Sequence, residues 1–437
     1  MITFRIDTLG CKVNQYESEA IAELLTKKGY KEQKENCDIH IINTCTVTNM
    51  SDSKSRQMIS RAKKDNPNSI VAVIGCYSQV KPDDVRNIDG VDIVLGSRNK
   101  EEVVTYIEQF LKDKPKETIE DVEEFEKHEG IEELGISNQN DMTRAYIKIQ
   151  DGCNMYCSYC LIPYARGPVS SRDIKDIVNE AKRLSDNGYK EIILTGIHVA
   201  SYGKDLDSNK SLIDVIEEIA KIDKVKRIRL SSMEPRHITR EFLERMRDTQ
   251  KACDHFHLSL QSGSDNVLKL MNRKYDTKIY RQKANLIREV FPNAALTTDI
   301  ITGFPGESEE DFIDTKKFVE EIGFSKVHIF KYSKRDGTKA ESFKEQVDPR
   351  IKKQRSKELS IIEKDKADEF RNSQIGKVLE VLIESKSDMD GYKQGYSTNY
   401  QRVNVGLDAK ENMIYDVLIE ENRNGELFGK IISESLK

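Results

Sequence analysis

Residues 151–166 read DGCNMYCSYCLIPYAR and hold three cysteines in a C-x3-C-x2-C arrangement, Cys153, Cys157 and Cys160. Thiols this close on one loop are typical of an iron–sulfur cluster, whose irons take cysteine sulfur as ligand. Zinc is the alternative metal, but it usually takes four ligands from paired cysteine or histidine spacings, and no histidine follows this loop at short range. In a four-iron cluster, three cysteines leave one iron open to a substrate. The spacing therefore indicates chemistry at the iron rather than electron transfer alone.

The whole chain has 437 residues, eight cysteines and a formal net charge of −5. Its length predicts two or three domains, and its charge does not indicate a nucleic-acid-binding surface over the whole protein. The first residues, MITFRID, lack the basic and apolar parts of a signal peptide, and no run is as long as a membrane span. We therefore expect a cytoplasmic protein without a membrane partner, whose thiols serve metals or catalysis.

Before the cysteine loop, residues 1–112 alternate strand-like and helix-like segments. The expected strands are 2–8, 38–43, 70–75 and 91–96. The expected helices are 15–29, 51–66 and 99–112. Such alternation predicts an α/β domain with an open parallel sheet.

Three further cysteines, Cys11, Cys45 and Cys76, each follow the C-terminal end of one of the first three expected strands. Those ends share one edge of a parallel sheet, where ligands bind, so we expect the three thiols to converge. Singly, each is equally consistent with a small buried core residue. Together they predict a second iron–sulfur cluster, again one ligand short. Cys37 and Cys253 lack this placement, and we expect them to be structural.

Residues 113–141 are acidic and aperiodic, which predicts a solvated linker. Residues 142–372 then repeat a strand–helix unit, with expected strands at 145–149, 191–195, 226–230, 255–260, 295–301 and 326–330. Six such units predict a partial (β/α)6 barrel, in which reacting groups come from the C-terminal ends of the strands. The cysteine loop follows the first of these strands, so its cluster would lie at that face.

Small and hydrogen-bonding residues gather at the ends of four successive strands of this barrel. They are Thr195 and Gly196, then Ser231, Ser232 and Glu234, then Gln261, Ser262 and Gly263, and last GFPGE at 303–307. Any one of them is compatible with simple turn chemistry. Their recurrence predicts a pocket for a polar ligand, which the glycines allow the backbone to approach closely.

Residues 373–437 alternate like the strands of a small antiparallel β-barrel, and Tyr396 and Tyr400 are candidates for base stacking. This segment holds 8 Lys and Arg against 11 Asp and Glu, so it cannot attract phosphate over its whole surface. RNA contact would need a local basic strip, and residues 53–64 and 350–357 are the candidates. The second of these strips begins a long expected helix.

The chain resembles the radical S-adenosylmethionine methylthiotransferases, in order and over nearly its whole length. The similar motifs are TLGCKVNQYES, NTCTVT, GCY, KIQDGCNMYCSYCLIPYARG, LTGIHVASYG, RLSSMEP, HLSLQSGSDNVLKLMNRKY, DIITGFPGESEEDF and HIFKYSKRDGT. GYSTNYQRVNV resembles the TRAM module, an RNA-binding barrel. TLGCKVNQYESEA is most similar to the MtaB-type branch, which modifies N6-threonylcarbamoyladenosine in tRNA, since other branches have Gln-Met or Pro-Lys at Lys12-Val13. The family often has arginine where Ser170 stands.

The resemblance implies two [4Fe–4S] clusters and S-adenosylmethionine as cofactors. The cluster on Cys153, Cys157 and Cys160 would bind and cleave S-adenosylmethionine. The cluster on Cys11, Cys45 and Cys76 would hold the sulfur that, methylated by a second S-adenosylmethionine, goes to C2 of adenosine 37 beside the anticodon. The implied cofactor-binding residues are Thr195, Gly196, Ser232, Glu234, Gln261, Arg172 and Gly303. The implied partners are the anticodon stem-loop of tRNA, an electron donor such as flavodoxin or ferredoxin, and a sulfur donor.

Other functions remain open at this point. Within the enzyme class, the alternatives are methylthiotransferases acting on isopentenyladenosine in tRNA or on a ribosomal protein. Outside it, they are an iron–sulfur electron carrier, which needs no polar pocket, and an RNA-binding protein with a structural metal. A radical step at carbon needs no general acid, so no histidine is expected to be catalytic, and His255 and His257 are expected to be structural.

Overall fold

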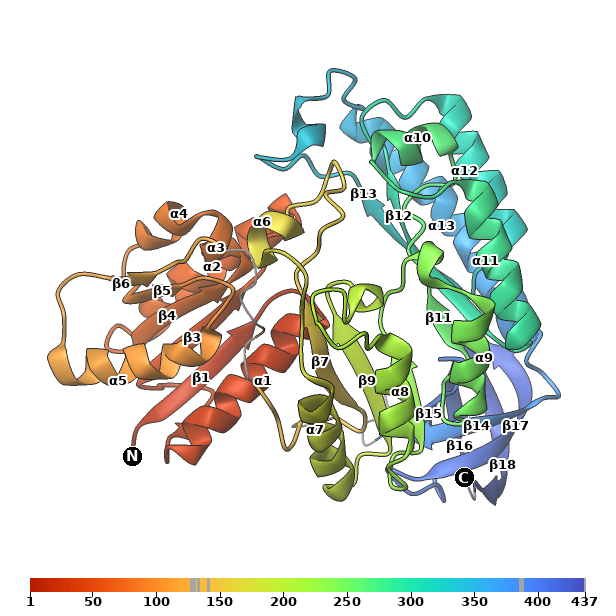
Figure 1. Cartoon of the computed structure of the whole chain (residues 1–437), viewed down its shortest axis with the longest axis horizontal. Helices are drawn as coiled ribbons and strands as arrows, with labels where there is room; N and C mark the ends of the chain where they lie inside the picture. The colour runs from red at the N-terminus through yellow and green to blue at the C-terminus, as the bar shows by residue number, and fades with distance from the viewer. Residues whose placement is uncertain (126–130, 132–133, 140–141, 385–388, 436–437) are drawn as a thin grey trace.

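A computed structural model describes residues 1–125, 131, 134–139, 142–384 and 389–435. Three parts follow one another along the chain, an α/β domain, a partial β/α barrel and a small β-barrel (Figure 1). The expected α/β architecture with a C-terminal barrel is therefore confirmed.

The first domain is a six-stranded sheet of order β2-β1-β3-β4-β5-β6, in which all pairs are parallel. Its strands are β1 (Thr3–Thr8), β2 (Lys31–Glu32), β3 (Ile39–Thr44), β4 (Ile70–Gly75), β5 (Ile93–Leu95) and β6 (Ile119–Asp121). The helices are α1 (Lys12–Lys27), α2 (Asn49–Asp65), α3 (Cys76–Val80), α4 (Pro82–Arg86) and α5 (Val103–Asp113), the last preceded by a 3-10 turn, η1 (Lys100–Glu102). Every residue of β3 and β4 is buried, because helices cover both faces of the sheet. The predicted open parallel sheet is confirmed, and only the short edge strands β2 and β6 were not expected.

The acidic segment 113–141 is not only a solvated connector. Part of it forms β6, which pairs with β5 and extends the first sheet. Further along, Leu134 and Ile136 are 3% and 0% exposed and join the apolar core of the barrel domain. The acidic composition hid these contacts because single apolar side chains between charges carry no periodic signal.

The second part is a barrel left open on one side. Its strands are β7 (Ala145–Asp151), β8 (Ser170–Ser171), β9 (Glu191–Gly196), β10 (Arg227–Leu230), β11 (His255–His257), β12 (Ala295–Thr302) and β13 (Lys326–Lys331). These strands form two groups, of order β10-β9-β7-β8 and β11-β12-β13. Isolated β-bridges connect the β10 region with the β11 region, for example between Ile228 and Ala252. Among the described residues no pairing closes β7 onto β13. The expected partial barrel of six parallel strands is confirmed, with β8 as a short antiparallel addition.

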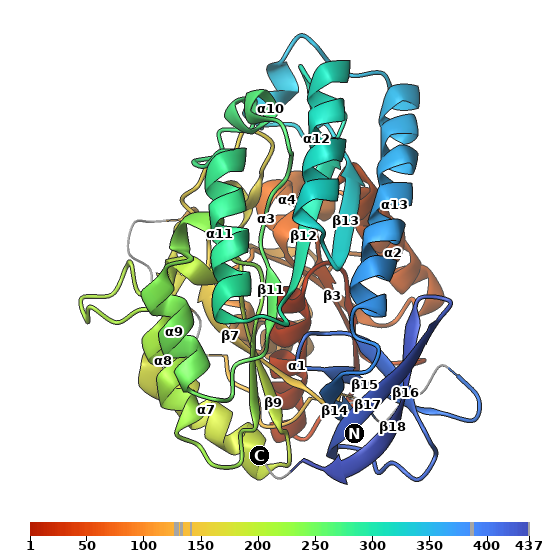
Figure 2. The same cartoon turned by 90° about the vertical axis from the view of Figure 1, so that its right-hand side faces the viewer.

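Helices cover the outside of this partial barrel, and α11, α12 and α13 run together over β12 and β13 (Figure 2). The helices and 3-10 turns are α6 (Ile162–Arg166), α7 (Ile174–Asp186), η2 (Val199–Ser201), α8 (Leu212–Ala220), η3 (Pro235–His237), α9 (Arg240–Asp248), α10 (Asp265–Leu270), α11 (Thr277–Val290), α12 (Glu309–Ile322), η4 (Lys339–Ser342) and α13 (Pro349–Asn372). Amphipathic helices over a parallel sheet leave the strand ends as the place for a ligand.

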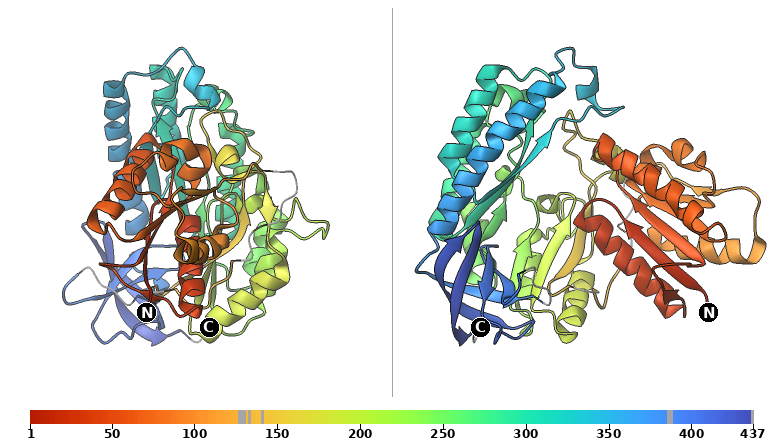
Figure 3. Two further views of the ribbon diagram at one scale, coloured as in Figure 1. Left: turned by 90° about the vertical axis from the view of Figure 1, so that its left-hand side faces the viewer. Right: turned by 180° about the vertical axis from the view of Figure 1, so that it is seen from behind.

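The first domain lies beside the partial barrel (Figure 3) and contacts both of its edges. At one edge α1 packs against β7. At the other, the loop after β13 reaches the first domain through Arg335, whose Nη2 donates to Asp52 at 2.7 Å and to Thr46 at 2.8 Å. Thr46 follows Cys45 directly. The C-terminal edge of the first sheet is therefore brought to the mouth of the barrel.

The C-terminal part is a closed barrel of order β14-β15-β16-β18-β17. Its strands are β14 (Val378–Ile383), β15 (Lys393–Ser397), β16 (Arg402–Val405), β17 (Ile414–Arg423) and β18 (Glu426–Glu434). All pairs are antiparallel except β16 with β18, which is parallel and closes the barrel. The expected small barrel is confirmed with that one correction.

Tyr396 and Tyr400 are not free to stack on bases. Their rings stack on each other with centroids 4.9 Å apart, and Arg144 lies 4.5 Å above the ring of Tyr396. Arg229 lies 4.6 Å above the ring of Tyr400 and donates to the carbonyls of neighbouring turn residues. The buried carboxylate of Glu191 pairs with Arg229 at 2.7 Å. The turn at 396–401 thus docks the C-terminal barrel beneath the partial barrel, at the N-terminal ends of its strands.

We expect Tyr400→Ala to loosen this junction. The substitution removes ring stacking and cation–π contacts worth about 2 kcal/mol in total. The midpoint of urea unfolding should fall, and limited proteolysis should release the segment after residue 372 sooner than in the wild type. Leu407→Ala, at a side chain 64% exposed on the same barrel, is the control and should change neither readout. Equal proteolysis of wild type and Tyr400→Ala would contradict this role.

Candidate functional site

The C-x3-C-x2-C loop lies between β7 and α6, at the C-terminal face of the barrel. Gly152 opens it with φ +68°, and a Cβ there would lie 1.8 Å from the carbonyl oxygen of Pro168. N–H groups point at the sulfur atoms, since Arg273 Nη1 donates to Cys157 Sγ at 3.2 Å and the Ile162 amide donates to Cys160 Sγ at 3.4 Å. Such N–H···S bonds are the outer contacts that tune iron–sulfur clusters.

The three thiols of this loop affect one another electrostatically. Burial raises the pKa of Cys160 to about 12, and the neighbouring Cys157 and Cys153 add to the rise while Arg273 opposes it. Burial also raises the pKa of Cys153, again with a contribution from Cys157. Thiols that are close and costly to ionise without a cation are the donor set that a metal cluster stabilises as thiolates. The loop fits an iron–sulfur cluster.

The first-domain cysteines come together as the parallel sheet predicts. Cys11 precedes α1, Cys45 follows β3 directly, and Cys76 begins α3 directly after β4. A Cβ on Gly10, whose φ is +113°, would lie 3.1 Å from Cys45 Sγ, so glycine lets the Cys11 and Cys45 loops approach. Burial is the main reason why the pKa of Cys45 is raised to about 11. The charges of Cys76 and Cys11 raise this pKa further. This second thiol set also fits a cluster.

Solvent reaches this trio through a cavity of about 730 Å³. Cys11 and Lys12 lie on its wall, together with residues from β1 and α1. Cys45 and Cys76 are buried, whereas Cys11 is exposed. A ligand that enters this cavity would therefore meet the trio at Cys11.

A buried ion network joins the two cysteine sets. Arg166, the last residue of α6, donates from Nε to Cys76 Sγ at 3.2 Å and from Nη1 to Asp151 at 3.0 Å. Its guanidinium also binds the carboxylate of Glu17 on α1. That carboxylate is fully buried and pairs further with Lys148 at 2.7 Å and with Lys100. Arg166 thus links the loop of one cysteine set to a thiol of the other.

The partners described in this network are three cations and two carboxylates. Lys100, Lys148 and Arg166 face the carboxylates of Glu17 and Asp151. Burial raises the pKa of Glu17, but Arg166, Lys100 and Lys148 overcome it and hold that pKa well below the usual range. The network therefore places the cationic side chain of Arg166 beside Cys76, a position that suits a thiolate bound to a metal.

We expect Glu17→Gln to destabilise the junction between the first domain and the barrel. The change leaves buried cations without their shared carboxylate, which costs about 3–5 kcal/mol of unfolding free energy. Urea denaturation followed by circular dichroism measures it. The control is Glu218→Gln, which removes a surface pair with Lys221 whose side chains are 43% and 68% exposed, and should cost less than about 1 kcal/mol. Similar effects of the two substitutions would contradict the buried network.

Most of the expected cofactor-binding residues lie at the barrel mouth. Thr195 and Gly196 end β9, and a Cβ on Gly196 would lie 2.8 Å from the Gln150 carbonyl oxygen. Ser232 is exposed after β10, and Gln261 adopts φ +74° beyond β11. These positions form a rim, as the strand ends predict, and their contacts with a cofactor stay a prediction.

Three of the expected cofactor-binding residues already have partners within the protein. Gly303 has φ +69° and donates from its amide to Glu307 Oε1 at 2.9 Å, beside Lys352. Glu234 is paired with Arg236 at 2.7 Å. Arg172 lies away from the mouth, where its Nη1 donates to Glu180, Tyr16 and the Lys148 carbonyl.

Several residues that shape the site were not expected from the sequence. Arg166 and Arg273 donate to cysteine sulfur, and His198 and His237 lie together at the rim. Their partners are distant in sequence, so no local pattern reveals them. Arg273 and Cys157, for example, are 116 residues apart. Only the placement of His198 and His237 just after two expected strands was a usable signal.

The comparisons with known proteins agree with this geometry. Residues 147–319 match the Radical SAM superfamily, and residues 3–96 match a family described as Uncharacterized protein family UPF0004. In solved structures the fold is similar to the radical S-adenosylmethionine methyltransferase TsrM from Kitasatospora setae, with a TM-score of 0.59, 12% identity, and 78% and 74% of the two chains covered. The barrel is therefore that of a radical S-adenosylmethionine enzyme.

Curated relatives narrow the family. The chain is 41% identical to threonylcarbamoyladenosine tRNA methylthiotransferase MtaB from Bacillus subtilis, over 92% of this chain and 90% of that protein. It is 39% identical to the Aquifex aeolicus protein of the same name, over 86% and 92%. It is 36% identical to tRNA-2-methylthio-N(6)-dimethylallyladenosine synthase from Clostridium tetani, over 98% and 96%. The chain belongs to the radical S-adenosylmethionine methylthiotransferase family.

The protein is therefore a transferase, and its cofactors are S-adenosylmethionine and [4Fe–4S] clusters. Among the described residues, no helix is both long and apolar enough to cross a membrane.

Proposed function

We propose that this enzyme inserts a methylthio group at C2 of N6-threonylcarbamoyladenosine at position 37 of tRNA, giving 2-methylthio-N6-threonylcarbamoyladenosine. The observation that carries the proposal is the pair of cysteine trios, at facing edges of two domains and linked by the contact of Arg166 with Cys76. One trio for radical formation and one for sulfur is what a methylthio transfer requires. The names of the MtaB relatives support the threonylcarbamoyl branch.

In this proposal the two cysteine trios have different functions. Cys153, Cys157 and Cys160 hold the cluster that binds S-adenosylmethionine at the barrel mouth, beside Thr195, Gly196, Ser232, Gln261 and Gly303. Cys11, Cys45 and Cys76 hold the cluster that carries the sulfur. The radical and sulfur-transfer chemistry is supplied by these cofactors when they are bound. The protein binds and orients them, and the contacts of the first domain with both edges of the barrel fix the two trios relative to each other.

Each trio also has an arginine at one of its sulfur atoms. Arg273 donates to Cys157 and Arg166 to Cys76, so each cluster would have a charged N–H donor at one thiolate. Such bonds stabilise the more negative, reduced form of a cluster and raise its potential. The protein therefore contributes to the redox balance between the two sites through one arginine on each.

Among the candidate basic strips, 53–64 is better placed for tRNA than 350–357. On α2, the side chains of Lys54, Arg56, Arg61 and Lys64 are exposed. In the other strip, Arg355 is buried in pairs with Glu307 and Glu309, and Lys352 lies 4.8 Å above the Tyr332 ring. We therefore assign the backbone of the anticodon stem to the α2 side. The remaining partners in this proposal are a flavodoxin- or ferredoxin-type electron donor and a sulfur donor, in the cytoplasm where tRNA is modified.

Iron content and cofactor cleavage test the two trios. Anaerobically reconstituted wild type should hold about eight iron atoms, and each triple alanine variant about four. Only the variant lacking Cys153, Cys157 and Cys160 should lose reductive cleavage of S-adenosylmethionine. Alanine at both Cys37 and Cys253 is the control and should keep all the iron. Undiminished iron after loss of Cys11, Cys45 and Cys76 would refute the second cluster.

Nucleoside mass spectrometry tests the substrate. In tRNA from a strain lacking this gene, the methylthio group should disappear from threonylcarbamoyladenosine and persist on isopentenyladenosine. The wild-type gene should restore it, and the Cys153→Ala gene should not. Loss from isopentenyladenosine instead would support the dimethylallyladenosine branch, the runner-up because of the Clostridium relative. An unchanged tRNA profile would point to a protein substrate or to electron transfer.

A further inference from the structure

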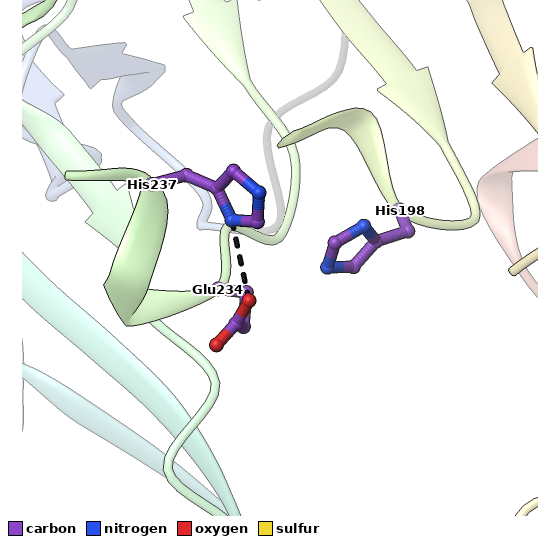
Figure 4. Close-up of side chains that lie close together, drawn as sticks. All are labelled: His198, Glu234 and His237. Atoms are coloured by element: carbon purple, nitrogen blue, oxygen red, sulfur yellow. Dashed lines mark ion pairs between the residues drawn. The ribbon is translucent and has the colours of Figure 1, made fainter. Parts of the chain in front are cut away.

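His198, Glu234 and His237 form a polar cluster at the barrel mouth that the proposed chemistry does not use (Figure 4). His198 follows β9, and the other two flank η3 after β10. Ligand-type atoms of the three side chains all lie within 4.8 Å of one another. Two histidines and one carboxylate are a common metal-binding set, so the first question is whether this one suits a cation.

The surrounding charges disfavour a metal. Lys204 Nζ lies 2.9 Å from His237 Nε2, so that nitrogen accepts from the ammonium, and the proton of the ring lies on Nδ1, facing Glu234 at 3.2 Å. Arg236 donates to both oxygens of Glu234, at 2.7 and 3.0 Å. The lone pairs a metal would need are occupied, and two permanent positive charges adjoin the cluster. With one carboxylate against two cations, the group has room for one more negative charge.

His198 presents an unpaired donor to this positive group. Its Nδ1 contacts the Ser201 hydroxyl, and we take the hydroxyl as the donor because it has no other acceptor among the described residues. Burial lowers the pKa of His198 to about 4, so the ring is neutral at pH 7. The single ring proton is then on Nε2, an atom that is buried and has no partner in the described part of the chain. A buried N–H without an acceptor is costly, which points to an acceptor that arrives with a ligand.

The cluster lies beside the cysteine loop. The amide of His198 donates to Gln150 Oε1 at 2.7 Å, and Gln150 lies on β7 just before that loop. Arg236 Nη2 lies 3.7 Å from Met155 Sδ, between Cys153 and Cys157. A ligand group held here would be next to the site where S-adenosylmethionine is bound.

We propose that His198 Nε2–H, Lys204 and Arg236 form a binding site for the carboxylate of the threonylcarbamoyl group on the target adenosine. This inference rests on the proposed function and assigns its substrate selectivity to named side chains. A carboxylate supplies the missing acceptor and the missing negative charge together. An isopentenyl group supplies neither and would leave the N–H buried and unpaired, the condition under which polar sites reject apolar analogues most strongly.

The test measures binding to the cluster-loaded, full-length protein without reductant, so that no turnover occurs. Three anticodon stem-loops differ only at position 37, which carries threonylcarbamoyladenosine, its neutral carboxamide analogue or adenosine. The wild type should prefer the carboxylate to the carboxamide by about tenfold or more. His198→Leu and Lys204→Met should each lower this preference several-fold while leaving affinity for the adenosine stem-loop unchanged. An effect confined to one analogue separates recognition from a general loss of structure.

Two further variants sharpen the result. His198→Gln places an N–H near the position of Nε2 and should retain most of the preference. The matched control for Lys204→Met is Lys210→Met, on the same loop. Lys210 makes a single long ion pair with Asp214, at 3.9 Å, and its substitution should keep the whole preference for the carboxylate. Since Lys204 is exposed, its variant is expected to fold even if His198→Leu does not.

Three outcomes would overturn the inference. They are a wild type without preference for the carboxylate, an unchanged preference in both His198→Leu and Lys204→Met, and a stoichiometric Zn²⁺ or Mn²⁺ that is lost in His198→Leu. None of these depends on the nucleoside profile of the deletion strain. In one combined result, the deletion strain loses the methylthio group from threonylcarbamoyladenosine while both variants keep the wild-type preference for the carboxylate. That result would support the proposed function and contradict only the carboxylate site.

Discussion

The buried carboxylate of Glu17 is the constraint on which the relation of the two cysteine sets depends. It accepts from Lys100, Lys148 and Arg166, which come from the first domain, from β7 and from the end of the cysteine loop. Removing such charges from water costs several kcal/mol per ion unless all partners are in place. The network therefore forms as a whole or not at all. Because α1 carries Glu17 into the barrel domain, folding that satisfies this carboxylate also sets Cys76 beside Arg166.

Most of the fold could be predicted from the sequence, because hydrophobic runs and helical spacing are local signals. The strands of both sheets lie within a few residues of their expected bounds, and the position of Cys11, Cys45 and Cys76 after parallel strands was enough to bring them together. The ion network could not be predicted. Glu17 sits in QYESEA, which looks like a solvated helix, and its partners lie 83, 131 and 149 residues away. Local patterns carry no information at that separation.

The C-terminal barrel shows how a local sequence pattern can suggest a role that its tertiary contacts do not allow. GYSTNYQ suggested aromatic rings for RNA, whereas the rings of Tyr396 and Tyr400 cover Arg144 and Arg229 at the closed end of the partial barrel. Those arginines surround Glu191, whose pKa is raised by burial but brought to about 2 by Arg227, Arg229 and Arg144. The positive charges of Arg144 and Arg229 attract the electron-rich faces of the rings. The aromatic side chains are thus used between domains, which leaves tRNA contact to other surfaces.

In such a protein, the substrate has to be selected by a few residues at the binding site. Relatives named for two different modified adenosines match this chain over most of its length, so the overall architecture serves both and cannot by itself distinguish their substrates. In the proposed function the cysteine trios are equally unselective, because they would act on the adenine ring that both substrates share. What differs between the substrates is the group on N6, charged in one and apolar in the other. In our proposal, a rim with one positive charge in excess and one unpaired N–H at His198 separates those two groups by the cost of leaving buried polar atoms unsatisfied.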